Sequence, residues 1–156
     1  MPTCHRVDLL RRRECLHLRG KLGHYRAPCL EILEATGDGQ VEGRTSTAVL
    51  EAVWHVELSG RTAVSRGLAR YAHALMAPLL PVTEEAFALA LTLNAPALGA
   101  NDRLHVGTCL AHGIALIVSA DRGFDRVAGI RRLDPLDDAG RRELLGSAVT
   151  SPRALH

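Results

Sequence analysis

Hydrophobic positions along the chain alternate between two spacings: a helical repeat of three and four residues, and short unbroken apolar runs. Helical patterns occupy five segments from residue 27 onward: 27–36, 45–60, 63–77, 83–95 and 101–113. Apolar runs that are typical of strands occupy residues 79–82 and 114–119, and the segment IRRLDP at 130–135 is interpreted as a last short strand. This alternation predicts an α/β fold with a mainly parallel sheet.

Two of the expected helices have a clear apolar face. The helix over 45–60 can be capped by Ser46 or Thr47 and ends at Gly60. We interpret one of its faces as core, formed by Val49, Leu50, Val53 and Trp54. The corresponding stripe over 63–77 consists of Leu68, Tyr71 and Leu75.

Composition limits the classes of function. The 156 residues fit one domain, and 47% hydrophobic residues are enough to bury a core. Only 3% are aromatic, which disfavours nucleic-acid binding by base stacking. No apolar run reaches the roughly 20 residues of a membrane helix, so we expect no membrane partner. The four cysteines are scattered without a disulfide framework, which favours a cytoplasmic protein.

Charge is distributed unevenly. Residues 1–26 carry seven basic and two acidic side chains, and because the whole chain is +2, the remainder carries −3. A nucleic-acid partner would therefore have to be bound by local contacts rather than by the overall charge of the domain. Neither a glycine-rich phosphate loop nor closely spaced zinc ligands occur in the sequence.

Three aspartates flank the apolar run at 114–119. Asp102 begins the preceding helix, and Asp121 and Asp125 follow the run. Ligands of parallel sheets bind at the carboxyl ends of the strands, where these side chains can meet. Converging carboxylates repel each other unless a divalent cation such as Mg²⁺ neutralises them. The alternative is that these aspartates are ordinary helix-start and turn residues.

Residues 24–135 resemble the PIN-domain family, especially the VapC-type toxin ribonucleases. The resemblance is strongest at the C-terminal end, in the segment GANDRLHVGTCLAHGIALIVSADRGFDRVAGIRRLDP. The matching positions are Asp102, Leu104, His105, Ser119, Asp121, Phe124, Asp125, Gly129, Leu133 and Pro135.

The resemblance implies a three-layer α/β/α sandwich and RNA cleavage that depends on Mg²⁺ or Mn²⁺. Asp102 and Asp121 would be metal ligands and catalytic acids, with Ser119 beside Asp121. Asp125 and Glu51 would be additional catalytic candidates. An RNA substrate, a cognate antitoxin protein and a homodimer are the partners that the resemblance implies.

Two acids of the family pattern are displaced or missing. The acid at the end of the first strand is expected near position 12, which Arg12 occupies. Codons that encode LLRRRECLHLRG can also encode YFVDASASTYAG one base later, which places an aspartate at position 12. We interpret the N-terminus as frame-shifted or divergent. The second acid, a glutamate on the helix over 45–60, is expected where Ala52 stands, and Glu51 lies one residue early.

We therefore expect one PIN-like domain over residues 1–156, with an atypical basic N-terminus (1–23) and a C-terminal tail (136–156). The alternative to a ribonuclease is a catalytically incomplete PIN-like binding module. A phosphate-ester enzyme on a similar sheet is a third interpretation, by fold analogy alone. His105 is interpreted as a partly buried helix residue that can contact the site.

Overall fold

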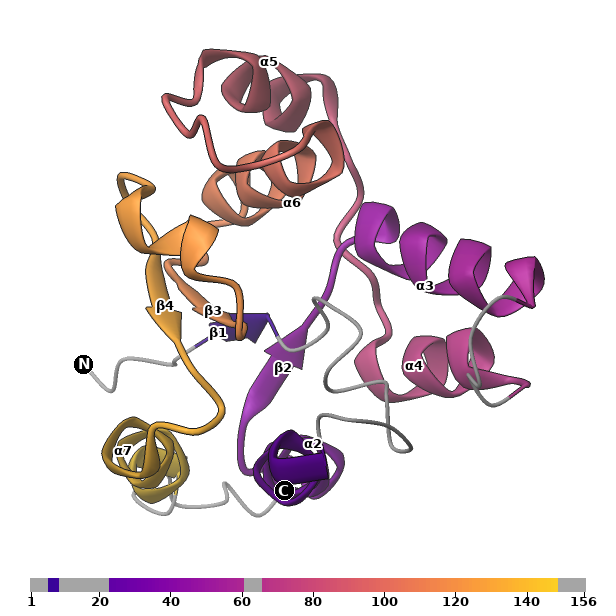
Figure 1. Cartoon of the computed structure of the whole chain (residues 1–156), viewed down its shortest axis with the longest axis vertical. Coiled ribbons are helices and arrows are strands. Elements are labelled where there is room, and N and C mark those ends of the chain that lie inside the picture. The colour runs from indigo at the N-terminus through magenta and orange to yellow at the C-terminus, as the bar shows by residue number, and fades with distance from the viewer. Residues whose placement is uncertain (1–5, 9–22, 61–65, 149–156) are drawn as a thin grey trace, which may run out of the picture.

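The centre of the fold is a four-stranded parallel sheet (Figure 1). The computed structural model of the chain describes residues 6–8, 23–60 and 66–148. The strands are β1 Arg6–Asp8, β2 Glu42–Arg44, β3 Leu116–Val118 and β4 Arg131–Leu133. They lie in the order β2-β1-β3-β4, so that β1 and β3 are the inner strands.

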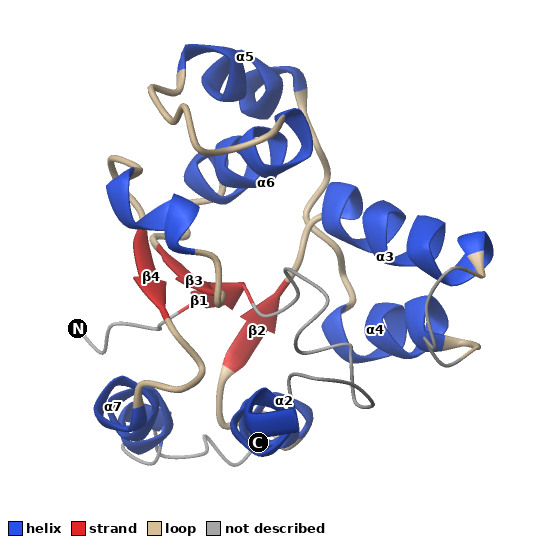
Figure 2. Cartoon of the chain, in the orientation of Figure 1, coloured by secondary structure: helices blue, strands red, loops and turns tan. Residues whose placement is uncertain are grey.

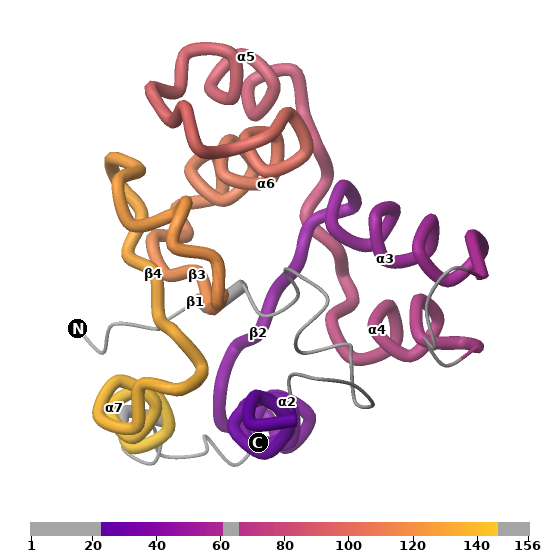
Figure 3. Tube along the Cα trace, viewed as in Figure 1, coloured from indigo at the N-terminus to yellow at the C-terminus, as the bar shows by residue number. Residues whose placement is uncertain are grey.

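Helices cover both faces of this sheet (Figure 2). The α-helices of the described residues are α2 Arg26–Gly37, α3 Thr47–Ser59, α4 Leu68–Met76, α5 Glu84–Thr92, α6 Ala100–Ala111 and α7 Asp138–Ala148. Short 3₁₀ helices occupy Gly23–Tyr25 (η1) and Arg122–Arg126 (η2). Helices α5 and α6 lie on one side of the sheet and α2 and α7 on the other, while α3 and α4 form a hairpin beside β2 (Figures 1 and 3).

The side chains of β3 join the three layers. Leu116 and Val118 pack into a cluster with side chains of α2, α3, α4 and α7. Ile117 points the opposite way, into a second cluster with side chains of α6 and of the loops that flank it. Alternate residues of a strand face opposite sides of a sheet, so an all-apolar strand belongs between two helical layers. The expected α/β/α sandwich is confirmed.

The other expected elements are found with one exception. Helices occur within all five predicted segments, and β3 and β4 lie within two of the predicted strands. The strand expected at 79–82 is wrong: Leu80 forms an isolated bridge, with its N–H and C=O bonded to Thr45 and Thr47. The partner segment turns into α3 at Thr47, so the pairing does not continue.

Two aromatic side chains expected in the core are exposed. Trp54 is 57% exposed and Tyr71 is 58% exposed, although Val49 and Val53 on the same helix as Trp54 are buried. One residue rotates a helix by about 100°, which turns Trp54 away from the face that Val53 occupies. On α4, Ala72 and Met76 form the buried contact instead of Tyr71.

The segment interpreted as a C-terminal tail contains α7. Leu144 of this helix is buried in the first core cluster, and Arg141 pairs with Glu31 on α2 at 2.7 Å. Residues 138–148 therefore belong to the packed domain.

Two further sequence expectations concern cysteines and membranes. Cys29 on α2 is disulfide-bonded, in contrast to the expectation of unpaired cysteines. Within residues 6–8, 23–60 and 66–148, no helix has the length and apolar character to span a membrane.

Candidate metal and catalytic site

The candidate site lies at the carboxyl edge of the sheet. Helix α3 begins just after β2, and Ser119 and Asp121 follow β3 directly. In the central strand β1, the last residue is Asp8, whose Cα is paired in register with Arg44 on one side and Ile117 on the other. Because all four strands are parallel, every strand ends at this edge, where ligands of open α/β sheets bind.

Asp102 is fixed in the first turn of α6. Its Oδ2 accepts a hydrogen bond from the backbone N–H of Gly99 at 3.3 Å, which holds the carboxylate over the start of the helix. The side chain is half-buried. The positive end of the helix dipole favours a carboxylate in this turn.

Asp121 is fixed in the turn after β3. Its backbone N–H donates to Ser119 Oγ at 3.0 Å, and its Oδ1 accepts from the N–H of Gly123 at 2.9 Å. Ser119 itself is buried, and its N–H donates to the carbonyl of Leu133 on β4 at 3.0 Å. Asp121 is therefore the N-cap of η2 and is half-buried.

The loop Ala97–Gly99 lies next to Gly123 and to the start of α6. A Cβ atom on Gly123 would lie 3.2 Å from Asp121 Oδ1, 3.0 Å from Leu98 Cδ2 and 3.6 Å from the carbonyl oxygen of Ala97. Gly99, the next residue of this loop, donates its N–H to Asp102. Each aspartate therefore has a neighbour in or beside this loop, and a metal site shared by the two carboxylates stays a prediction.

Helix α6 is joined to the start of α3 by two side-chain contacts. Ser46 Oγ, which caps α3 by accepting from the N–H of Val49, lies 2.8 Å from His105 Nδ1. Asn101 Nδ2 donates to the carbonyl of Ala48 at 3.4 Å. His105 is fully buried rather than partly buried as expected, and its Nε2 lies 3.7 Å from Cys109 Sγ.

Glu51 lies on the solvent side of α3. Its side chain is exposed, like those of Thr47 and Leu58 on the same helix. Ala52 is half-buried on the turn that follows Ala48, the residue that Asn101 contacts. The helix therefore presents Ala52, and not Glu51, toward α6.

Asp125 is bound to an arginine of β4. Arg132 donates to Asp125 through Nε at 2.6 Å and Nη2 at 3.4 Å, and through Nη1 to Asp134 Oδ2 at 3.1 Å and the carbonyl of Ser119 at 2.7 Å. The hydrogen bond from Arg132 is the main cause that lowers the pKa of the Asp125 carboxyl. This ion pair ties η2 to the sheet, a structural role that sequence spacing did not indicate.

The metal-ligating groups of the described residues are too few to form a complete cluster. No group of three or more His, Cys, Asp or Glu side chains suited to a metal occurs within the part of the chain whose side chains the structure describes. Arg12, where the family pattern expects an acid, lies outside the described residues. β1 ends at Asp8, four residues before the position at which the sequence pattern expects the acid.

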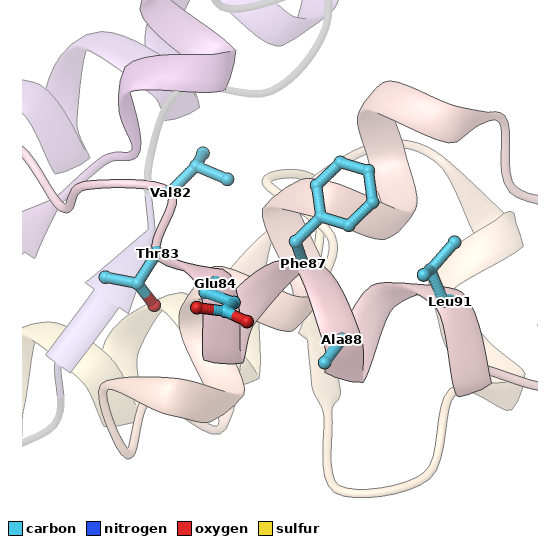
Figure 4. Close-up of a pocket in the computed structure, with 6 residues that line it drawn as sticks. All are labelled: Val82, Thr83, Glu84, Phe87, Ala88 and Leu91. Atoms are coloured by element: carbon cyan, nitrogen blue, oxygen red, sulfur yellow. The ribbon is translucent and has the colours of Figure 1, made fainter.

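A shallow pocket of about 440 Å³ lies elsewhere, on α5 (Figure 4). Phe87 and Leu91 project from this helix over the pocket, with Val82 and Thr83 at its start. Ala86 and Ala90 occupy the opposite face of α5, toward Gly107 of α6. The pocket is therefore on the outer surface of the α5–α6 layer, and it contains none of the predicted site residues.

Comparison with protein-family models gives a match to the PIN domain over residues 25–130. No curated protein and no solved structure matches the chain. The matched residues include α3, α6 and β3 together with Asp102, Asp121, Asp125 and Glu51.

Proposed function

The chain belongs to the PIN-domain family, and we propose that it is a divalent-metal-dependent ribonuclease of the VapC toxin type. PIN domains are generally nucleases, and the fold is the α/β fold of that family. The observation that supports the proposal is that Asp102 is bonded to Gly99 at the start of α6, while Asp121 follows β3 and is bonded to Gly123, a neighbour of Leu98 in the same loop.

The residues at this edge fit a hard divalent cation. Asp102 and Asp121 provide carboxylate oxygens, and the neighbouring Asn101 provides an amide oxygen that is buried and accepts no hydrogen bond from the described residues. Mg²⁺ and Mn²⁺ prefer oxygen ligands, and Mg²⁺ is commonly held by one or two carboxylates together with water and substrate phosphate. We therefore assign Mg²⁺ or Mn²⁺ to Asp102 and Asp121.

The protein's own groups have distinct roles in this proposal. A divalent cation, when bound, supplies charge stabilisation and activation of water for attack on a phosphodiester. Gly99 and Gly123 orient the carboxylates of Asp102 and Asp121 through their backbone N–H groups. Ser119 holds the backbone of Asp121, so that its carboxylate is fixed before substrate binds. Glu51 is a remote candidate because it is exposed.

Asp8 lies four residues before the position expected for the first acid of the family pattern. It is the last residue of the first strand, in register with Ile117 one residue before the end of β3. We include it in the proposal as a third acid. Among the exposed arginines, Arg122 follows Asp121 directly and is suited to contact an RNA phosphate locally.

The proposed partners are an antitoxin protein and a second copy of the chain. Large apolar side chains are exposed on two surfaces: Trp54, Leu58 and Tyr71 on the neighbouring helices α3 and α4, and Phe87 and Leu91 on α5. Exposed apolar side chains grouped in this way are typical of protein interaction sites. A cytoplasmic location completes the proposal, since toxin and RNA substrate would meet there.

The second candidate function is a PIN-like binding module without catalysis. Ala52 stands where the family has a glutamate, and the described side chains form no cluster of three acids. Such a module would keep the fold and bind RNA or protein, but it would not cleave.

A ribonuclease assay on purified protein separates the two functions. We expect single-stranded RNA to be cleaved in Mg²⁺ or Mn²⁺, and cleavage to stop when the metal is chelated and to return when it is restored. Asp38→Asn, which changes an exposed carboxylate at the end of α2, is the matched control and should keep full activity. Asp8→Asn should reduce cleavage. Absence of cleavage in folded protein with added metal would favour the binding module.

A further inference from the structure

Two buried oxygen atoms at the carboxyl edge accept no hydrogen bond from the described residues. They are Asn101 Oδ1 on the first turn of α6 and Thr45 Oγ1 just after β2. An unsatisfied buried polar atom costs about 1–3 kcal/mol, and native proteins usually satisfy such atoms with protein groups, water or an ion. Thr45 is fully buried, so its hydroxyl cannot be satisfied by bulk solvent.

The amide of Asn101 has a defined orientation. Its Nδ2 donates to the carbonyl oxygen of Ala48 at 3.4 Å, so Oδ1 is the atom left without a donor. If the amide nitrogen and oxygen of Asn101 were exchanged, Oδ1 would face the carbonyl oxygen of Ala48, and both atoms are acceptors. The amide is thus held against α3 by its nitrogen, and its oxygen is available for another group.

This contact places Asn101 beside the position of the missing acid. In an α-helix the carbonyl of residue i points toward residue i+4, so the Ala48 carbonyl faces the turn that carries Ala52. Ala52 is where the family pattern has a glutamate. The Asn101 amide therefore lies at the start of the space that a glutamate side chain would otherwise enter from α3.

We propose that Asn101 Oδ1 is a ligand of the divalent cation assigned to Asp102 and Asp121, in place of the glutamate that α3 lacks. The inference rests on the proposed function, because it takes that metal site as given. An amide oxygen is a hard donor and suits Mg²⁺ and Mn²⁺, although it adds no charge. The substitution explains how a site without the α3 glutamate can still bind a metal, with lower affinity than a carboxylate at that place would give.

Mn²⁺ binding to the intact protein tests this role without any need for activity. Free Mn²⁺ is measured by electron paramagnetic resonance for the wild type, Asn101→Leu and Asn101→Asp. Each variant is first shown to be folded by its thermal unfolding in chelator. We expect Asn101→Leu to weaken binding by at least about tenfold. Asn101→Asp should bind Mn²⁺ at least as tightly as the wild type, because a carboxylate replaces the amide oxygen.

The exposed Asn94, in the loop before α6, provides matched controls. Asn94→Leu and Asn94→Asp should leave Mn²⁺ affinity within twofold of the wild type. Asn101→Leu with unchanged affinity, or Asn101→Asp as weak as Asn101→Leu, would overturn the inference and leave the proposed function standing. A wild type that binds no Mn²⁺ would overturn both, so the two failures are distinguishable.

Discussion

Asp121 and Asp125 lie four residues apart and have different partners. Asp121 faces the N–H of Gly123 next to the loop Ala97–Gly99, whereas Asp125 accepts two hydrogen bonds from Arg132 on β4. The same Arg132 also donates to the carbonyl of Ser119, the residue that holds Asp121. Asp125 therefore supports the site through the backbone, and we do not assign it to the metal.

The lowered pKa of Asp125 gives its ion pair a defined pH dependence. A carboxyl whose pKa is lower in the folded than in the unfolded state stabilises the fold above its ordinary pKa. That contribution is lost as the pH falls through the lowered folded value. We expect Asp125→Asn to reduce the free energy of unfolding at pH 7, and this difference to shrink as the pH falls below the ordinary pKa of 3.8 and to vanish once the pH is below the lowered folded pKa.

Urea unfolding of the wild type and Asp125→Asn at pH 7 and at pH 3 measures this difference. Asp38→Asn is the control for a change of surface charge alone. A destabilisation of equal size at both pH values would contradict the assignment of Asp125 to an ion pair.

At the scale of elements, one residue of helix rotation separates Glu51 from the site. Glu51 is on the exposed side of α3, and Ala52 is on the half-buried side near Asn101. A glutamate at position 52 would extend from the correct side of the helix. The introduced glutamate could reach toward α6 without any rearrangement of Glu51.

We therefore expect Ala52→Glu to raise Mn²⁺ affinity by about tenfold or more, because it adds a charged oxygen ligand. Glu51→Gln, which removes the displaced acid, should change affinity by less than twofold. Binding isotherms of the two variants against the wild type check both outcomes. If Glu51→Gln lost affinity and Ala52→Glu gained none, Glu51 would be the α3 ligand.

Helices α5 and α6 approach closely at a glycine. A Cβ atom on Gly107 would collide with the backbone carbonyl of Ala86 and would lie 3.1 Å from the Cβ of Ala90. Because backbone atoms cannot move aside cheaply, the two helices would have to separate. Asp102 lies on the same helix as Gly107, and the loop 97–99 leads directly into that helix, α6.

We expect Gly107→Ala to lower the free energy of unfolding by about 1–3 kcal/mol. Gly146→Ala is the matched control, because Gly146 is an exposed helical glycine of α7 with no heavy atom near its Cβ position. That substitution should raise stability by about 0.5–1 kcal/mol through helix propensity. Urea titration gives both values, and equal effects would show that α5 and α6 do not pack through Gly107.

For the whole molecule, hydrophobic spacing predicted helices α2 to α6 and the strands β3 and β4, but not β1 or β2. Spacing could not show that Trp54 lies outside the core. A rotation of α3 by one residue decides whether Trp54 is buried, and the packing of α4 against α3 sets that rotation. Spacing also could not locate β1: strand length and register at Asp8 come from pairing with β2 and β3. Asn101 was not predicted as a site residue, because a single asparagine at the start of a helix forms no sequence motif.

The two central aspartates were identified from sequence because each stands at an element boundary that its neighbours predict. Asp102 begins a periodic helix, and Asp121 follows an apolar strand. The loop 97–99 lies next to Gly123, a residue distant along the chain, which only the structure shows.

The most direct test of the account is RNA cleavage by Asp102→Asn beside the wild type, at equal folded concentration over a titration of Mg²⁺. The substitution keeps the size of the side chain and an acceptor for the N–H of Gly99, so that α6 keeps its start. We predict wild-type cleavage that saturates with Mg²⁺ and a rate at least about 100-fold lower for Asp102→Asn at every concentration, since a metal ligand is lost. Equal rates for the two proteins would contradict the assignment of the site.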